Sequence, residues 1–168
     1  ALYPPLAGIR KISLAIAVDR SFSLSAARLN DAVTATRRLL GELRTEDRVT
    51  LLALGSEVET LTPLSSDHRA AYDALGRLDP WGTTPLYDAT LAALNAIQGA
   101  AGRRALILVS DGSDRYSTTS ADAIVAEARR RDVIIYPVAL NRTPPPVFVE
   151  LAAVSGGRST IAPGAAKK

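Results

Sequence analysis

The sequence predicts an α/β fold built on a doubly wound, mostly parallel sheet with helices on both faces. Short aliphatic and β-branched runs alternate with longer segments of helical periodicity along the 168 residues, and this alternation is typical of right-handed βαβ units. Two of the apolar runs, residues 12–18 and 105–110, are almost continuous, as expected of strands buried on both faces. We expect a single domain over residues 1–168, with a core at about 12–162, a leader at 1–11 and a frayed tail at 163–168.

In the first half of the chain, the hydrophobic periodicity predicts three strands and three helices. Leu29, Val33 and Leu40 recur at helical spacing and give the first helix one apolar face. Ser66 is a suitable N-cap for the second helix, and Thr84 for the third, where Pro85 would take the first helical position. The predicted strands cover residues 12–18, 49–54 and 58–62, and the predicted helices cover 26–43, 66–78 and 85–100.

The second half of the chain continues the alternation. A strand at 105–110 leads into the turn Asp111-Gly112-Ser113-Asp114, and Ser120 or Thr119 can cap the next helix. Two glycines at 156–157 end the last helix, and a final edge strand can follow them. The predicted strands cover residues 105–110, 133–140 and 159–162, and the predicted helices cover about 120–131 and 147–154.

The composition excludes several classes of function. The chain has no cysteine, which rules out disulfides, thiolate metal sites and cysteine nucleophiles. With His68 as its only histidine, it cannot form the histidine pairs of most zinc and non-haem iron enzymes. A net charge of +3 is too small to predict nucleic-acid binding, and no apolar stretch is long enough to insert into a bilayer.

Two aspartates follow the two most apolar strands: Asp19 follows residues 12–18, and Asp111 follows residues 105–110. In the common strand order 3-2-1-4-5-6 these strands are neighbours about 4.8 Å apart, and ligands bind beyond their carboxyl ends. Two carboxylates at such a separation repel each other unless one is protonated or a cation lies between them. Ser21, Ser23 and Thr84 can add hydroxyl oxygens, and an all-oxygen set predicts Mg²⁺ first, then Mn²⁺ or Ca²⁺.

These residues belong to three motifs that follow one another along the chain. Together they resemble the metal-ion-dependent adhesion site of von Willebrand factor type A (integrin I-like) domains, and the resemblance runs from about residue 12 to residue 161. It departs from the family pattern at Thr83, where a glycine is usual, at Ser110, where a threonine is common, and at Arg20, a large basic residue. The motifs are Asp19-Arg-Ser21-Phe-Ser23, Gly82-Thr83-Thr84-Pro85-Leu86-Tyr87-Asp88-Ala89 and Val109-Ser110-Asp111-Gly112.

The resemblance implies a Rossmann-like, six-stranded sheet with one short antiparallel edge strand, here residues 58–62. It also implies that Ser21 and Ser23 bind the metal directly, that Thr84 binds it directly or through water, and that Asp19 and Asp111 bind mostly through water. The remaining position would receive an acidic residue of a partner protein. The family further suggests an open/closed switch through movement of the last helix, here residues 147–154.

We therefore expect a metal-dependent protein-binding module without catalytic activity, belonging to a larger chain or assembly. Arg20 and Arg115 can steer an acidic ligand, and Thr83 and Trp81 can line the binding face, although Trp81 could equally pack over a loop. One alternative is a Mg²⁺-dependent hydrolase or phosphoacceptor that uses the same aspartates. No P-loop is present and the lysines are confined to positions 11, 167 and 168, which disfavours it. A structural domain clamped by its metal is the second alternative. The sequence leaves the cellular compartment open.

Overall fold

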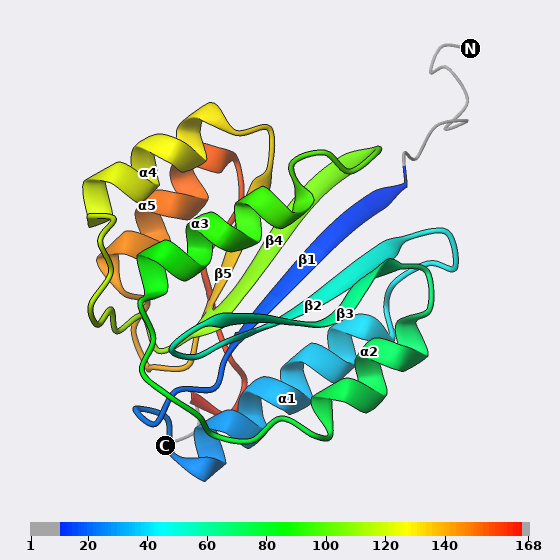
Figure 1. The fold of residues 1–168 in the computed structure, drawn as a ribbon, viewed down its shortest axis with the longest axis horizontal. Helices are drawn as coiled ribbons and strands as arrows, with labels where there is room; N and C mark the ends of the chain where they lie inside the picture. Colours follow the sequence, from blue (N-terminus) through cyan, green and yellow to red (C-terminus); the bar gives the residue numbers. More distant parts are fainter. Residues whose placement is uncertain (1–10, 166–168) are drawn as a thin grey trace.

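A computed structural model describes residues 11–165 and shows a single six-stranded sheet between two groups of helices. Helices α1 and α2 cover one face, and α3, α4 and α5 cover the other (Figure 1). The strands are β1 (Ile12–Asp19), β2 (Arg48–Leu54), β3 (Val58–Ser65), β4 (Arg103–Ser110), β5 (Ile134–Ala139) and β6 (Thr160–Ile161). The helices are α1 (Ala26–Leu40), α2 (His68–Leu75), α3 (Leu86–Ile97), α4 (Ala121–Arg130) and α5 (Pro146–Ser155).

The strand order is β3-β2-β1-β4-β5-β6, which confirms the predicted fold class. Strand β3 runs antiparallel to β2, and the other neighbouring strands are parallel. The antiparallel edge strand is longer than expected, because its pairing with β2 extends to Ser65. β1 and β4 are paired up to Val18 and Val109, so their carboxyl ends meet at one edge of the sheet.

The core consists of two apolar layers, one on each face of the sheet. Along β1, Leu14, Ile16 and Val18 pack toward α1 and α2, whereas Ala15 and Ala17 pack toward α3, α4 and α5. This alternation is the period of two that a strand imposes. All five of these side chains are buried, as predicted for a strand covered on both faces.

Helices α1 and α2 are shorter than the sequence predicted. α1 ends at Leu40 because the N–H groups of Gly41 and Glu42 turn back to carbonyls of the last helical turn. α2 begins at His68 with Asp67, not Ser66, as its N-cap, since the Asp67 carboxylate accepts a hydrogen bond from the N–H of Ala70 at 3.1 Å. The predicted cap at Ser66 was therefore wrong by one residue, because an aspartate at the next position competes for the same role.

The C-terminal half agrees with the predicted strands and helices to within two residues at almost every end. Gly156 ends α5 with φ = 84°, a left-handed conformation that glycine adopts at little cost. β6 is a two-residue strand paired with β5. Beyond it, the N–H of Ala165 donates to the carbonyl of Ala162 at 2.9 Å. Residues 1–10 of the expected leader and 166–168 of the expected tail lie outside the described residues. None of the helices in residues 11–165 is long and apolar enough to cross a membrane.

Asp47, the residue before β2, ties together the loop before that strand and the start of β1, at the end of the sheet opposite the carboxyl ends of β1 and β4. Its buried carboxylate accepts hydrogen bonds from the N–H of Ile12 at 3.1 Å and of Arg44 at 3.0 Å, and its carbonyl oxygen lies 2.7 Å from Nε2 of His68. Burial by itself would raise the pKa of Asp47. The hydrogen bonds from Arg44 and Ile12 outweigh burial and hold the pKa below its ordinary value.

We expect Asp47→Asn to lower the free energy of unfolding by about 1–3 kcal/mol at neutral pH, because charge-assisted bonds to buried N–H groups are lost. A carboxyl whose folded pKa lies below its unfolded value stabilises the fold above the unfolded pKa, and this contribution disappears as the pH falls through the folded pKa. The difference between wild type and variant should therefore shrink in acid. Urea denaturation from about pH 6 down to about pH 2 measures it.

Asp132→Asn is the matched control, because the side chain of Asp132 is 99% exposed although it pairs with Arg104, and exposed ion pairs contribute little. An Asp47→Asn variant as stable as the wild type at neutral pH, or a loss that does not change with pH, would contradict this role of Asp47.

Candidate metal centre

The carboxylates and hydroxyls named from the sequence come together where β1 and β4 end. Asp19 is the last residue of β1, and Ser21 and Ser23 follow it in the next loop. Asp111 follows the last residue of β4, and Thr84 stands two residues before α3. Ser21, Ser23 and Thr84 line one surface cavity of about 280 Å³, and the sheet pairing places Asp19 and Asp111 at the same edge.

Asp19 is the centre of this arrangement and is completely buried. One carboxylate oxygen, Oδ1, accepts hydrogen bonds from the N–H of Ser21 at 2.8 Å and from Thr84 Oγ1 at 2.9 Å. The other, Oδ2, accepts a hydrogen bond from Ser110 Oγ at 2.6 Å. A single carboxylate therefore joins β1, β4 and the loop before α3.

The two serines of the loop after β1 turn their hydroxyls toward each other. Ser21 Oγ and Ser23 Oγ are 2.8 Å apart; Ser21 is buried, whereas Ser23 is exposed. The backbone of Arg20 fixes the start of this loop, because its N–H donates to the carbonyl of Leu54 and its own carbonyl accepts from the N–H of Trp81. The loop thus presents two hydroxyl oxygens at the cavity.

Asp111 lies one residue beyond the strand end, so Ser110 and not Asp111 stands across from Asp19. Asp111 is 6% exposed, and its Oδ1 accepts a hydrogen bond from the N–H of Ser113 at 2.9 Å. Its carbonyl accepts a hydrogen bond from Asn141. In the sequence, Ser110 stands out only because a threonine is common at its position in the family pattern. Its bond to Asp19 depends on strand register, which the residue type does not reveal.

Thr84 directs its hydroxyl to Asp19, and the predicted N-cap at Thr84 was wrong. The N-cap position of α3 is Pro85, which has no side-chain cap hydrogen bond. The N–H of Tyr87 instead donates to Asp114 Oδ1 at 3.2 Å and to Ser117 Oγ at 3.1 Å, both in the loop between β4 and α4. Sequence reasoning missed this support, because a helix terminus capped by a distant loop leaves no local signal.

Asp88, in the first turn of α3, binds the same β4–α4 loop. Its carboxylate accepts hydrogen bonds at 2.9 Å from the N–H groups of Thr118 and Thr119. Hydrogen bonds from Thr119 and Thr118 lower the pKa of Asp88 below its ordinary value. Asp88 and Asp114 therefore position the loop and the helix around the site.

The electrostatics of Asp19 favour a bound cation. Burial raises the pKa of Asp19, and the hydrogen bonds from Ser110, Ser21 and Thr84 only partly offset this effect. All of these donors are neutral, and within residues 11–165 neither Asp19 nor Asp111 takes part in an ion pair. A hard divalent cation would supply the missing positive charge. Since no group of three His, Cys, Asp or Glu side chains suited to a metal occurs in this range, hydroxyls would complete the ligand set.

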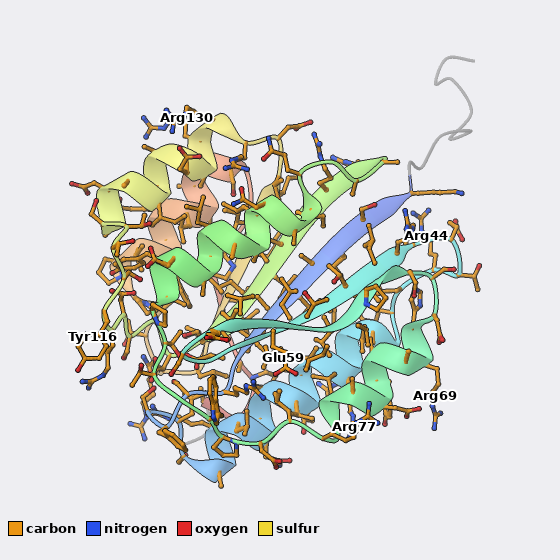
Figure 2. The ribbon with its side chains drawn as sticks, in the orientation of Figure 1. Arg44, Glu59, Arg69, Arg77, Tyr116 and Arg130 are labelled. Atoms are coloured by element: carbon orange, nitrogen blue, oxygen red, sulfur yellow. The ribbon has the colours of Figure 1, made fainter. Side chains whose placement is uncertain are left out.

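The four residues expected to line the ligand-binding rim divide into two pairs. Thr83 and Arg115 line the cavity that contains Ser21, Ser23 and Thr84. Arg20 and Trp81 instead line a neighbouring cavity, where Arg20 Nη2 lies 2.6 Å from Glu59 Oε2 and the guanidinium stacks 5.4 Å from the centre of the Trp81 ring. The side chain of Arg20 is thus held toward β3 (Figure 2 labels Glu59), away from the hydroxyl cluster.

Comparisons with known proteins agree with this architecture. A family model described as "von Willebrand factor type A domain" matches residues 14–113. Among curated proteins, no sequence match was found. Three solved structures share the fold. Their sequences are at most 20% identical to this chain, so they show similarity of fold alone.

The conserved hypothetical protein BatB from Bacteroides thetaiotaomicron is 19% identical with a TM-score of 0.74, and the match covers 89% of each chain. A von Willebrand factor type A protein from Catenulispora acidiphila is 20% identical with a TM-score of 0.76, over 90% of this chain and 38% of that one. Manganese-loaded TRAP protein from Plasmodium vivax is 20% identical with a TM-score of 0.70, over 90% of this chain and 68% of that one.

In metal-free protein at neutral pH, we expect Asp19→Asn to raise the free energy of unfolding. The folded state raises the pKa of Asp19 above its ordinary value of 3.8, so stability falls as the pH rises from the unfolded to the folded pKa, and the cost persists at higher pH. An amide of the same shape avoids that cost. Urea denaturation in chelator at neutral and acidic pH measures the difference, which should vanish in acid.

Asp79→Asn is the control for that measurement, because Asp79 is exposed and its substitution should leave stability unchanged. A metal-free Asp19→Asn protein that is less stable than the wild type at neutral pH would show that the ionised carboxylate is compensated within the chain itself.

Proposed function

The chain belongs to the von Willebrand factor type A family, and from this membership and the site geometry we propose that it is a divalent-cation-dependent protein-binding module. Its cation would receive the carboxylate of an Asp or Glu residue on a partner protein. The observation that carries the proposal is the fully buried Asp19, whose hydrogen-bond donors are all neutral and which lies beneath a cavity lined by converging hydroxyls.

Five side chains would hold the cation in a metal-ion-dependent adhesion site. The hydroxyls of Ser21, Ser23 and Thr84 border the cavity. Buried Asp19 accepts hydrogen bonds from the Ser21 N–H and from Thr84 Oγ1, and Asp111 follows the end of the neighbouring strand β4. All of their ligand atoms are oxygens, which favours Mg²⁺, with Mn²⁺ or Ca²⁺ as alternatives. The similar fold of the manganese-loaded TRAP protein supports a divalent cation.

The charges around the site favour the arrival of an anionic ligand. Two carboxylates balance the charge of a divalent ion, and hydroxyls are neutral donors, so the ion retains affinity for a further carboxylate. The exposed Arg115 on the cavity rim adds positive charge and raises the local concentration of acidic partners. An acidic residue of a partner protein is therefore the ligand that this cavity suits.

We propose a binding role without catalysis, because no histidine, lysine or carboxylate of residues 11–165 is part of the cavity lining. The lining within residues 11–165 consists of serines, threonines, a glycine, two aromatic residues and one arginine. The single histidine, His68, contacts Asp47 at the opposite edge of the sheet. Acid–base chemistry needs a titratable group within hydrogen-bond reach of the substrate.

We expect Mg²⁺ and Mn²⁺ to raise the melting temperature of the wild-type protein and to have no effect on Asp19→Ala. At a metal concentration 100 times the dissociation constant, the gain is about 2.7 kcal/mol, or roughly 5–10 °C for a domain of this size. Differential scanning calorimetry after chelator treatment measures the shift. Asp79→Ala should keep the full shift; an unchanged shift in Asp19→Ala, or no metal uptake by the wild type in titration calorimetry, would refute the metal site.

Peptides selected from a random display library by Mg²⁺-dependent binding to the immobilised chain should each contain an Asp or Glu. EDTA should release them, because the carboxylate binds through the cation. Replacing that residue with Asn or Gln should weaken binding at least tenfold in titration calorimetry, and the Asp19→Ala chain should capture none of them. Recovery of peptides whose binding is equal in Mg²⁺ and in EDTA would contradict the proposed function.

A further inference from the structure

Two strongly exposed aromatic side chains stand on the rim of the hydroxyl-lined cavity. Phe22 is 69% exposed and Tyr116 is 83% exposed. Both line the cavity that contains Ser21, Ser23 and Thr84, although they come from different loops. Figure 2 shows Tyr116 projecting outward from the loop between β4 and α4. Aromatic rings are usually buried in a monomer, and exposed ones are enriched in interfaces.

The direction of Phe22 follows from the serines on either side of it. Ser21 and Ser23 point their hydroxyls toward each other at 2.8 Å, which leaves the intervening side chain outside the loop. The N–H of Phe22 donates to the carbonyl of Gly82 at 2.9 Å, so its backbone is anchored to the loop that leads to Thr84. The hydroxyl cluster and the exposed ring are therefore consequences of one loop conformation.

Tyr116 is held in a strained conformation on the other loop. Its φ of 68° makes it the one residue other than glycine with a positive φ in the described part of the chain, and such a conformation is unfavourable for a bulky side chain. The hydrogen bonds on either side maintain it: Arg115 N–H donates to the carbonyl of Thr84 at 2.9 Å, and Ser117 Oγ donates to Asp114 Oδ1 at 2.6 Å. The folded chain thus keeps the ring in solvent next to the cavity.

Resting on the proposed function, we infer that Phe22 and Tyr116 form an aromatic rim that selects a partner segment in which the metal-binding Asp or Glu is flanked by an apolar side chain. An occupant of the cavity would contact both rings, since both line it. The acidic residue would enter between them, and Arg115, which forms no ion pair within residues 11–165, supplies the complementary charge. The occupant is a segment of a partner protein.

The experiment compares two peptides on chain variants. One is the tightest Mg²⁺-dependent peptide from the display library, and the other is the same peptide with the apolar residues within two positions of its acid replaced by serine. They are titrated into the wild type, Phe22→Ser, Tyr116→Gly and, as a control, Tyr72→Ser, which removes an exposed aromatic ring from α2. Glycine at position 116 tolerates the positive φ, so the fold of that variant is preserved.

We expect the selected peptide to carry an apolar residue within two positions of its acid and to bind about tenfold more weakly to Phe22→Ser and Tyr116→Gly. The serine-substituted peptide should show a similar loss on the wild type. Affinity for Mn²⁺ alone should be the same in all four chains. Equal binding of the selected peptide to wild type and both rim variants, or a parallel loss of Mn²⁺ affinity, would overturn the aromatic rim and leave the metal site standing. Absence of any metal-dependent acidic peptide would overturn both.

Discussion

The structure depends on one buried carboxylate, that of Asp19 at the end of β1, the strand that lies between β2 and β4. Asp19 accepts hydrogen bonds from the loop that follows it, from Ser110 at the end of β4 and from Thr84 ahead of α3. A carboxylate without access to water needs charge compensation or protonation, and its contacts within the described chain are neutral. The same group therefore joins the loop after β1, the end of β4 and the loop before α3, and it creates a demand for positive charge that a divalent cation would satisfy. The ionised Asp19 carboxylate destabilises the metal-free fold. This cost is the physical basis of the proposed cation binding.

The fold supplies the rigid frame that makes this arrangement possible. β1 lies between β2 and β4, so the loop after β1 emerges where the neighbouring parallel strands also end. The α3 terminus is supported from outside, since Asp114 and Ser117 of the β4–α4 loop bind the N–H of Tyr87. These contacts connect the loop that bears Asp111 to the one that bears Thr84. Displacement of either loop would therefore alter the other.

The polar and the aromatic parts of the site follow from the same loop geometry. The loop conformation that brings the hydroxyls of Ser21 and Ser23 together leaves the ring of Phe22 exposed, and the contacts that join Arg115 to the Thr84 loop hold Tyr116 in solvent. A cation with neutral hydroxyl ligands would bind carboxylates of many kinds, since a point charge distinguishes them poorly. Shape and apolar contact around the cation would supply the selectivity. The side chain of Arg20 lies outside this cavity, because Glu59 and Trp81 hold it toward β3.

The sequence by itself determined the alternation of strands and helices, the burial of both faces of β1, and the positions of the three loops that carry carboxylates and hydroxyls. These features depend on periodicity and on the residues next to each strand end, which are local. The metal, its ligand set and the acidic partner remain predictions. Only the tertiary structure decided where the Thr84 hydroxyl binds. Its acceptor, Asp19, is 65 positions away in the sequence, whereas the local pattern had predicted that the hydroxyl caps α3. The tertiary structure also decided that Ser110 pairs with Asp19 and that Phe22 and Tyr116 stand exposed beside one cavity, since strand register and contacts between loops bring these residues together.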